Sequence, residues 1–143
     1  MDNKINRYFC VQPFVNTTTR IRGQNNVCCN INTLESTIDK ESPNDFFNSN
    51  RVKQMREKLL HGEKLRECSL CHYQENVSKS SQRIEYNKYY NIKNDQDKGY
   101  YENITKKLRL SDLKNPLYAE LHISNLCNLK CLSCNEYDSS KFH

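Results

Sequence analysis

Threonine and β-branched residues dominate the chain from 15 to 22, and this pattern predicts a β-strand. Gly23-Gln24-Asn25-Asn26 follows, and glycine and asparagine tolerate the positive φ angles that tight turns need. Residues 27–31 would then form the returning strand of a hairpin. Three cysteines belong to this unit, one at its entrance and two on its second arm: Cys10, Cys28 and Cys29.

Apolar positions with helical spacing come next, at Val52, Met55, Leu59 and Leu60. Most of them are three or four residues apart, which predicts an amphipathic helix. Asn48 or Ser49 can cap its start, and Gly62 stands where a C-terminal cap belongs. Residues 73–90 contain no glycine or proline, and we expect one further helix there.

A last short strand is predicted from Tyr118, in which Leu121 and Ile123 would share one face, and Ser124 and Asn125 would then turn the chain. The stretch before it, residues 93–116, begins with polar residues and is typical of a linker with a short helix. Pro116 marks the end of this linker, because proline disfavours helix in the residue before it.

The composition is that of one domain with a thin hydrophobic core. The chain has 143 residues, of which 36% are hydrophobic and none is tryptophan. Eight cysteines could reinforce such a core, as disulfides outside the cell or as metal ligands in a reducing cytosol. The N-terminus is polar, and no apolar run has the length of a membrane span. We therefore expect a cytoplasmic protein with metal-bound cysteines and no membrane partner.

Three cysteines follow the last predicted strand with the spacing C-x3-C-x2-C: Cys127, Cys131 and Cys134. Three thiolates in one loop can hold three corners of an iron–sulfur cube and leave the fourth iron open. This spacing directly after a strand resembles the signature of the radical SAM enzymes. The alternative is a structural zinc loop with a fourth ligand from elsewhere, such as His122 or His143.

The resemblance to radical SAM enzymes implies a definite chemistry. The open iron of the [4Fe–4S] cluster would bind S-adenosylmethionine (SAM) through its amino and carboxylate groups. One electron from the cluster would then cleave SAM reductively and generate a 5′-deoxyadenosyl radical, which takes hydrogen from a substrate. Peptide or protein modification is a typical task of such relatives. A flavodoxin- or ferredoxin-like partner would donate the electron.

A second cysteine set lies in the first half of the chain: Cys10, Cys28, Cys68 and Cys71. The predicted hairpin and the C-x2-C turn can bring these four thiolates to one point. A C-x2-C pair at a helix start also lies beside backbone N–H groups, which lowers thiol pKa values and favours ligation.

This half of the chain resembles the twitch domain, a shortened relative of the SPASM domain, in which such cysteines hold an auxiliary [4Fe–4S] cluster. The similar segments are Phe47-Asn48-Ser49 with the helix entry up to Arg56, the run from Leu60 to Cys71, and Ser80-Ser81-Gln82-Arg83 with Tyr86-Asn87. The sequence departs from the family pattern at Phe47, where tryptophan is usual, and at residues 11–14, where Cys-x-x-Pro-Trp is common.

Two points stay open for this set: which of Cys28 and Cys29 is the ligand, and which metal group the cysteines hold. Consecutive strand residues face opposite sides, so only Cys28 or Cys29 should reach the cluster, and the Gly-x4-Cys spacing favours Cys28. A zinc site with four thiolate ligands is the alternative to the auxiliary cluster. His61 and His72 are expected on the surface, and Arg83 on a solvated helix face.

The net charge gives no reason to expect a nucleic-acid partner. Lys and Arg number 22 against 17 Asp and Glu, so the formal charge is +5 with cysteine counted as neutral. With seven thiolates around two [4Fe–4S] cores of about +2 each, the net charge falls to about +2. No basic run with interleaved aromatic residues is present either.

The two resemblances together imply an α+β fold. A hairpin-plus-helices, twitch-like domain would span residues 1–92, and a linker with a short helix residues 93–116. Residues 117–143 would supply the first strand and the cluster loop of a radical SAM (β/α) barrel. Because such a barrel needs further βα units, we expect residues 1–143 alone to be inactive, as the N-terminal part of a larger enzyme. A non-catalytic zinc-binding interaction module is the alternative function.

Overall fold

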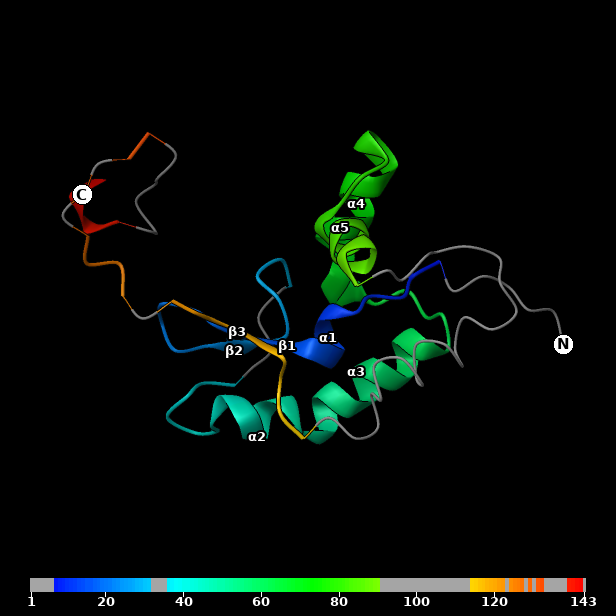
Figure 1. Cartoon of the computed structure of the whole chain (residues 1–143), viewed down its shortest axis with the longest axis horizontal. Helices are drawn as coiled ribbons and strands as arrows, with labels where there is room; N and C mark the ends of the chain where they lie inside the picture. The colour runs from blue at the N-terminus through cyan, green and yellow to red at the C-terminus, as the bar shows by residue number, and fades with distance from the viewer. Residues whose placement is uncertain are drawn as a thin grey trace, which may run out of the picture.

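A three-stranded mixed sheet combines two strands from the first part of the sequence with one from the last part. The computed structural model describes residues 7–31, 36–90, 114–122, 124–127, 129, 131–132 and 139–142. Its strands are β1 (Asn16–Thr19), β2 (Asn25–Asn26) and β3 (Tyr118–Leu121), in the order β2-β1-β3. β2 pairs antiparallel with β1, and β3 pairs parallel with the other edge of β1, beside which it lies in Figure 1. The described part is therefore α+β, with a sheet that is not closed.

The first strand of the predicted hairpin is confirmed in a shorter form, but its turn and second arm are misplaced, because the chain turns at residues 21–22 and Asn25–Asn26 already form β2. The turn closes where Arg20 N–H donates to Gln24 O at 2.9 Å, and Gly23 has a φ of 75°. Strand β2 ends at Asn26, and residues 27–31 form bends and turns. Side chains donate hydrogen bonds to the carbonyls of this segment. Asn16 donates to Val27 O at 3.1 Å, and Arg20 donates to the carbonyls of Cys29 and Ile31. These carbonyls therefore serve no strand ladder.

Helix α3 (Asn50–Leu60) begins and ends as the sequence predicts. The Ser49 side chain accepts the Val52 N–H at its start. At its end Gly62 adopts a φ of 77°, and the N–H groups of Gly62 and Glu63 donate to the carbonyls of Leu59 and Lys58. This pair of hydrogen bonds defines the Schellman motif, which glycine permits because it lacks a Cβ.

The prediction of one helix over residues 73–90 is wrong, because two helices fill this stretch. Helix α4 (Ser69–Ser78) ends at Lys79, which has a left-handed φ of 59°. Helix α5 (Gln82–Tyr89) starts at Ser81, whose hydroxyl accepts the Ile84 N–H at 3.3 Å. Serine at such a position favours a helix cap over a helix interior.

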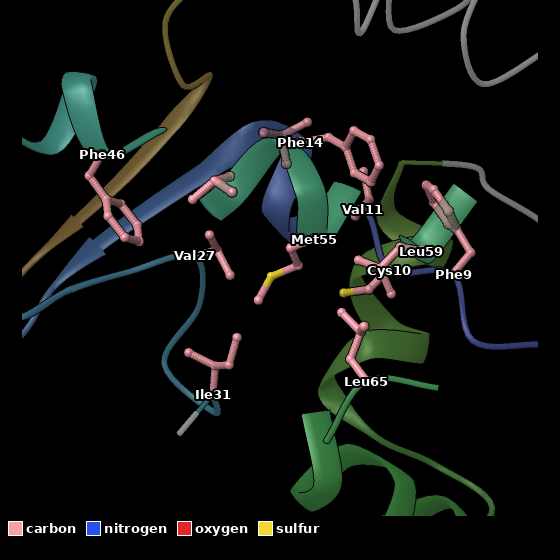
Figure 2. Close-up of a cluster of buried hydrophobic side chains, with 12 residues drawn as sticks. Phe9, Cys10, Val11, Phe14, Val27, Ile31, Phe46, Met55, Leu59 and Leu65 are labelled. Carbon is pink, nitrogen blue, oxygen red and sulfur yellow. The ribbon is translucent and has the colours of Figure 1, made fainter. Parts of the chain in front are cut away.

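The remaining described helices are short: α1 (Gln12–Val15), α2 (Pro43–Phe47), and the 3-10 turns η1 (Arg66–Cys68) and η2 (Ser140–Phe142). Twelve buried side chains from α1, α2, α3 and the adjoining segments form the core shown in Figure 2. Cys10 is one of them and lies beside Leu59 and Leu65 in that view. The core therefore surrounds one of the predicted ligands.

Several predicted features lie outside the described residues, namely the linker helix within 100–113, Ile123, Cys134 and His143. Within the described part, no helix is both long enough and apolar enough to cross a membrane.

Candidate metal centre

Four cysteines from three segments of the chain line one small cavity: Cys10, Cys28, Cys68 and Cys71. Cys10 lies just before α1, and Cys28 lies in the turn after β2. Cys68 is the N-cap residue of α4, and Cys71 belongs to the first turn of that helix. The structure thus brings the whole predicted set together, although its members are up to 61 positions apart in sequence.

Burial keeps the thiols of Cys10, Cys28 and Cys68 protonated at neutral pH. It raises the pKa of Cys28 to about 11 and that of Cys68 to about 12, and that of Cys10 well above its ordinary value. Neighbouring thiols of the same set add to each rise, because thiolates repel one another. The lowered pKa expected at the helix start is therefore wrong for Cys68. A bound metal would have to replace protons at this site.

The four thiols share the lining of one cavity. Among the described residues, no three Cys, His, Asp or Glu side chains converge tightly enough to hold a single metal ion. All four candidate donors are sulfur, and Ile31 and Tyr86 contribute apolar wall. Soft thiolates select zinc, copper(I) or iron–sulfur clusters, and a cluster spans a wider ring of sulfurs than one ion does.

Cys28 and Cys29 are separated by their surroundings. Cys28 lines the cavity, whereas the Cys29 thiol donates to Gln82 Oε1 at 3.2 Å and does not line it. The side that each faces thus agrees with Cys28 as the candidate ligand.

Arg83 was expected on a solvated face, and that expectation is wrong. The residue is 4% exposed and lines the cavity. It lies 2.6 Å from Glu75, in a pair of hydrogen bonds that satisfies the buried guanidinium. Sequence spacing does not indicate this pairing, because Glu75 lies on another helix, eight residues earlier.

The histidines near the cysteines differ from one another. His61 is exposed, as predicted, and its Nδ1 lies 2.8 Å from Glu57 O. His72 is 6% exposed, against the surface role expected for it, and its ring packs edge-on against Tyr8. His122, the candidate fourth zinc ligand, is 2.9 Å from Glu120.

After β3 the chain leads away from α3, α4 and α5 (Figure 1), and two members of the later cysteine set, Cys127 and Cys131, are described there. Cys127 is half-buried and Cys131 is exposed, and Cys134 is outside the described residues. The Cys127 sulfur accepts the Leu129 N–H at 3.4 Å, and Ser140 N–H donates to Asn125 O at 2.7 Å. The chain thus folds back on itself around Cys127, and the meeting of all three thiols stays a prediction.

Comparisons with protein-family models, with curated proteins and with solved structures found no match for this chain.

Proposed function

We propose that this chain is an iron–sulfur protein whose early cysteines, Cys10, Cys28, Cys68 and Cys71, hold an auxiliary [4Fe–4S] cluster. The observation that carries the proposal is the convergence of these four thiols on one cavity from three separate segments. Each thiol would give up its proton on binding, and the burial of Cys10 would limit the access of water to the cluster on that side.

A zinc-binding interaction module is the competing function. Zinc in a structural site draws four ligands into a closed tetrahedron around one ion. The described thiols line one cavity, and no three of them are preset for a single ion. The resemblance of this half of the chain to the twitch domain is what favours a cluster over zinc.

We further propose that Cys127, Cys131 and Cys134 hold the SAM-binding cluster of a radical SAM enzyme. Two observations support this: the loop follows strand β3, and the Cys127 sulfur already accepts a backbone N–H. When bound, the cluster would supply the electron that cleaves SAM to the 5′-deoxyadenosyl radical. The substrate class would be a peptide or protein, and a flavodoxin- or ferredoxin-like protein the electron donor.

In this proposal residues 1–92 are the twitch-like auxiliary domain, 93–116 the linker, and 117–143 the opening of the (β/α) barrel. The parallel pairing of β3 with β1 would then connect the auxiliary domain directly to that opening.

Anaerobic reconstitution with iron and sulfide tests both sites. We expect about eight iron and eight sulfide per chain, because each [4Fe–4S] cluster holds four of each. Cys68→Ser/Cys71→Ser and Cys131→Ser should each lose about half of the iron, and Cys29→Ser, the matched control, should lose none. Bound zinc without acid-labile sulfide in the unaltered chain would contradict the proposal and support the interaction module.

A further inference from the structure

Helix α5 carries no cysteine, yet one of its side chains holds the backbone on both sides of Cys10. Asn87 Oδ1 accepts the Val11 N–H at 3.0 Å, and Asn87 Nδ2 donates to Phe9 O at 2.9 Å. Both peptide groups are buried and would otherwise be costly, so the amide replaces the backbone of a neighbouring strand. Asn87 itself is 1% exposed, which fixes its orientation.

Arg83, one turn earlier on α5, connects the same segment to the helix of the C-x2-C pair. Its Nη1 donates to Phe9 O at 2.8 Å. Its Nε and Nη2 donate to the Glu75 carboxylate at 2.8 and 2.6 Å. Glu75 lies on α4, one turn after Cys71. The guanidinium therefore joins the Cys10 segment to the helix that carries the Cys68 and Cys71 thiols.

A third α5 side chain, Gln82, accepts the hydrogen bond of the Cys29 thiol. Three side chains of α5, Gln82, Arg83 and Asn87, thus contact all three cysteine-bearing segments. None of them is a ligand contact, and α5 packs against the cavity through Gln82, Arg83 and Tyr86.

We infer that α5 is the positioning element of this centre, with Arg83 and Asn87 as positioning residues for Cys10. They set where the Cys10 sulfur stands relative to the Cys68 and Cys71 sulfurs. Arg83 also brings a buried positive charge to the cavity, where it lowers the pKa of Cys10 and of Cys68 against the larger rise due to burial. The identity of the bound group as an iron–sulfur cluster rests on the proposed function, whereas the positioning of Cys10 does not.

The first arm of the test uses the metal-free, reduced chain. Cys10 alkylation by iodoacetamide is followed by mass spectrometry in the unaltered chain, Asn87→Leu and Arg83→Lys. Loss of either contact should speed Cys10 alkylation about tenfold, because buried peptide groups lose their partners and the segment opens more often. Lys88→Met, an exposed residue of the same helix, is the control and should leave the rate unchanged.

The second arm uses the reconstituted protein. A [4Fe–4S] cluster that has lost its Cys10 ligand gives up one Fe²⁺ and one electron when ferricyanide oxidises it. The [3Fe–4S] cluster that remains is detected by electron paramagnetic resonance. All variants of this arm also carry Cys131→Ser, which removes the later cluster and its open iron. In that background Asn87→Leu and Arg83→Lys should show the signal, and Lys88→Met should not. Circular dichroism checks folding, and if Asn87→Leu fails to fold, Arg83→Lys decides, since it keeps the charge but loses the two-pronged contact with Glu75.

The two arms separate the inference from the proposed function. Folded variants that alkylate Cys10 at the unaltered rate and keep a four-iron cluster would overturn the role of α5. An unaltered chain that takes up no iron, with Cys10 alkylation still accelerated in both variants, would overturn the proposed cluster and leave the role of α5 standing.

Discussion

At the scale of single residues, Gly23, five positions before Cys28, adopts a backbone conformation that favours glycine. Its φ of 75° is costly for residues with a Cβ, and a Cβ built there would lie 3.2 Å from Ile38 Cγ1. The residue is also anchored on both sides, because its N–H donates to Arg20 O and its carbonyl accepts the Ile38 N–H. The backbone conformation of this turn therefore explains why glycine stands at the start of the Gly-x4-Cys spacing.

Gly23→Ala should lower the free energy of unfolding of the metal-free chain by about 1–2 kcal/mol, through the left-handed backbone and the contact with Ile38. Urea unfolding followed by circular dichroism measures this. Lys40→Ala, an exposed change in the adjacent turn, serves as the control. Equal midpoints for Gly23→Ala and the unaltered chain would contradict the argument.

The pairing of Glu75 with Arg83 makes stability depend on acid. Burial alone would raise the pKa of Glu75, but hydrogen bonds from Arg83 and Ser81, with the guanidinium charge, lower it below its ordinary value. A carboxyl with a lowered folded-state pKa stabilises the fold above its unfolded pKa of about 4.3, and this stability is lost as pH falls further.

Glu75→Gln should accordingly destabilise the chain at pH 7 and much less at pH 3. Urea midpoints of both proteins across that range give the comparison. Glu85→Gln, which removes an exposed carboxylate paired with Lys88, is the control and should show a smaller pH-dependent difference. A Glu75→Gln difference that is the same at pH 7 and pH 3 would contradict the linkage.

Residue patterns in the sequence located the four early cysteines but not their supports. Arg83 and His72 were expected near solvent because local spacing says nothing of distant partners. Phe9, which Arg83 contacts, is 74 residues away in sequence, and the ring partner of His72 is Tyr8. Buried polar residues of this kind become visible only when the segments are placed together.

At the scale of elements, capping signals were the most informative. Ser49 and Gly62 fixed the ends of α3 because each satisfies backbone groups within its own few residues. The break between α4 and α5 was missed, since absence of glycine and proline does not exclude a left-handed residue. Strand β2 also ended early, because side chains from β1 and the turn occupy the carbonyls that follow it.

Lys79→Gly should stabilise the chain by about 0.5–1 kcal/mol, because a left-handed lysine at the end of α4 carries a steric cost that glycine avoids. The thermal midpoint of the metal-free protein reports this. Ser78→Gly, one residue earlier and inside the helix, is the control and should destabilise. A lower midpoint for Lys79→Gly would show that the left-handed cap is not the source of strain.

At the scale of the whole molecule, the early thiols act as a group. The folded-state pKa values of Cys10, Cys28 and Cys68 are raised, to about 11 for Cys28 and about 12 for Cys68, against about 8.5 for an unfolded thiol. A group with a raised folded-state pKa gives its full stability below the unfolded pKa. That stability is then lost as pH rises through the folded value.

The metal-free chain should therefore lose stability steadily from about pH 8.5 to 11, more steeply than Cys28→Ser/Cys68→Ser does. Urea midpoints across this range measure the difference, and the comparison cancels the titration of tyrosine and lysine common to both proteins. Parallel pH profiles of the two proteins would contradict the effect.

The register of β3 against β1 has a consequence for synthesis. Thr18 and Glu120, which face each other across this pair, are 102 residues apart, so one edge of β1 has no strand beside it until the ribosome has made almost the whole described chain. Until β3 is made, this unpaired edge has the sequence Asn-Thr-Thr-Thr. Its polar side chains offer a neighbouring nascent chain little apolar surface for association. The late arrival of β3 is thus tolerable, and the join between the two cysteine-bearing parts is the last piece of the sheet to form.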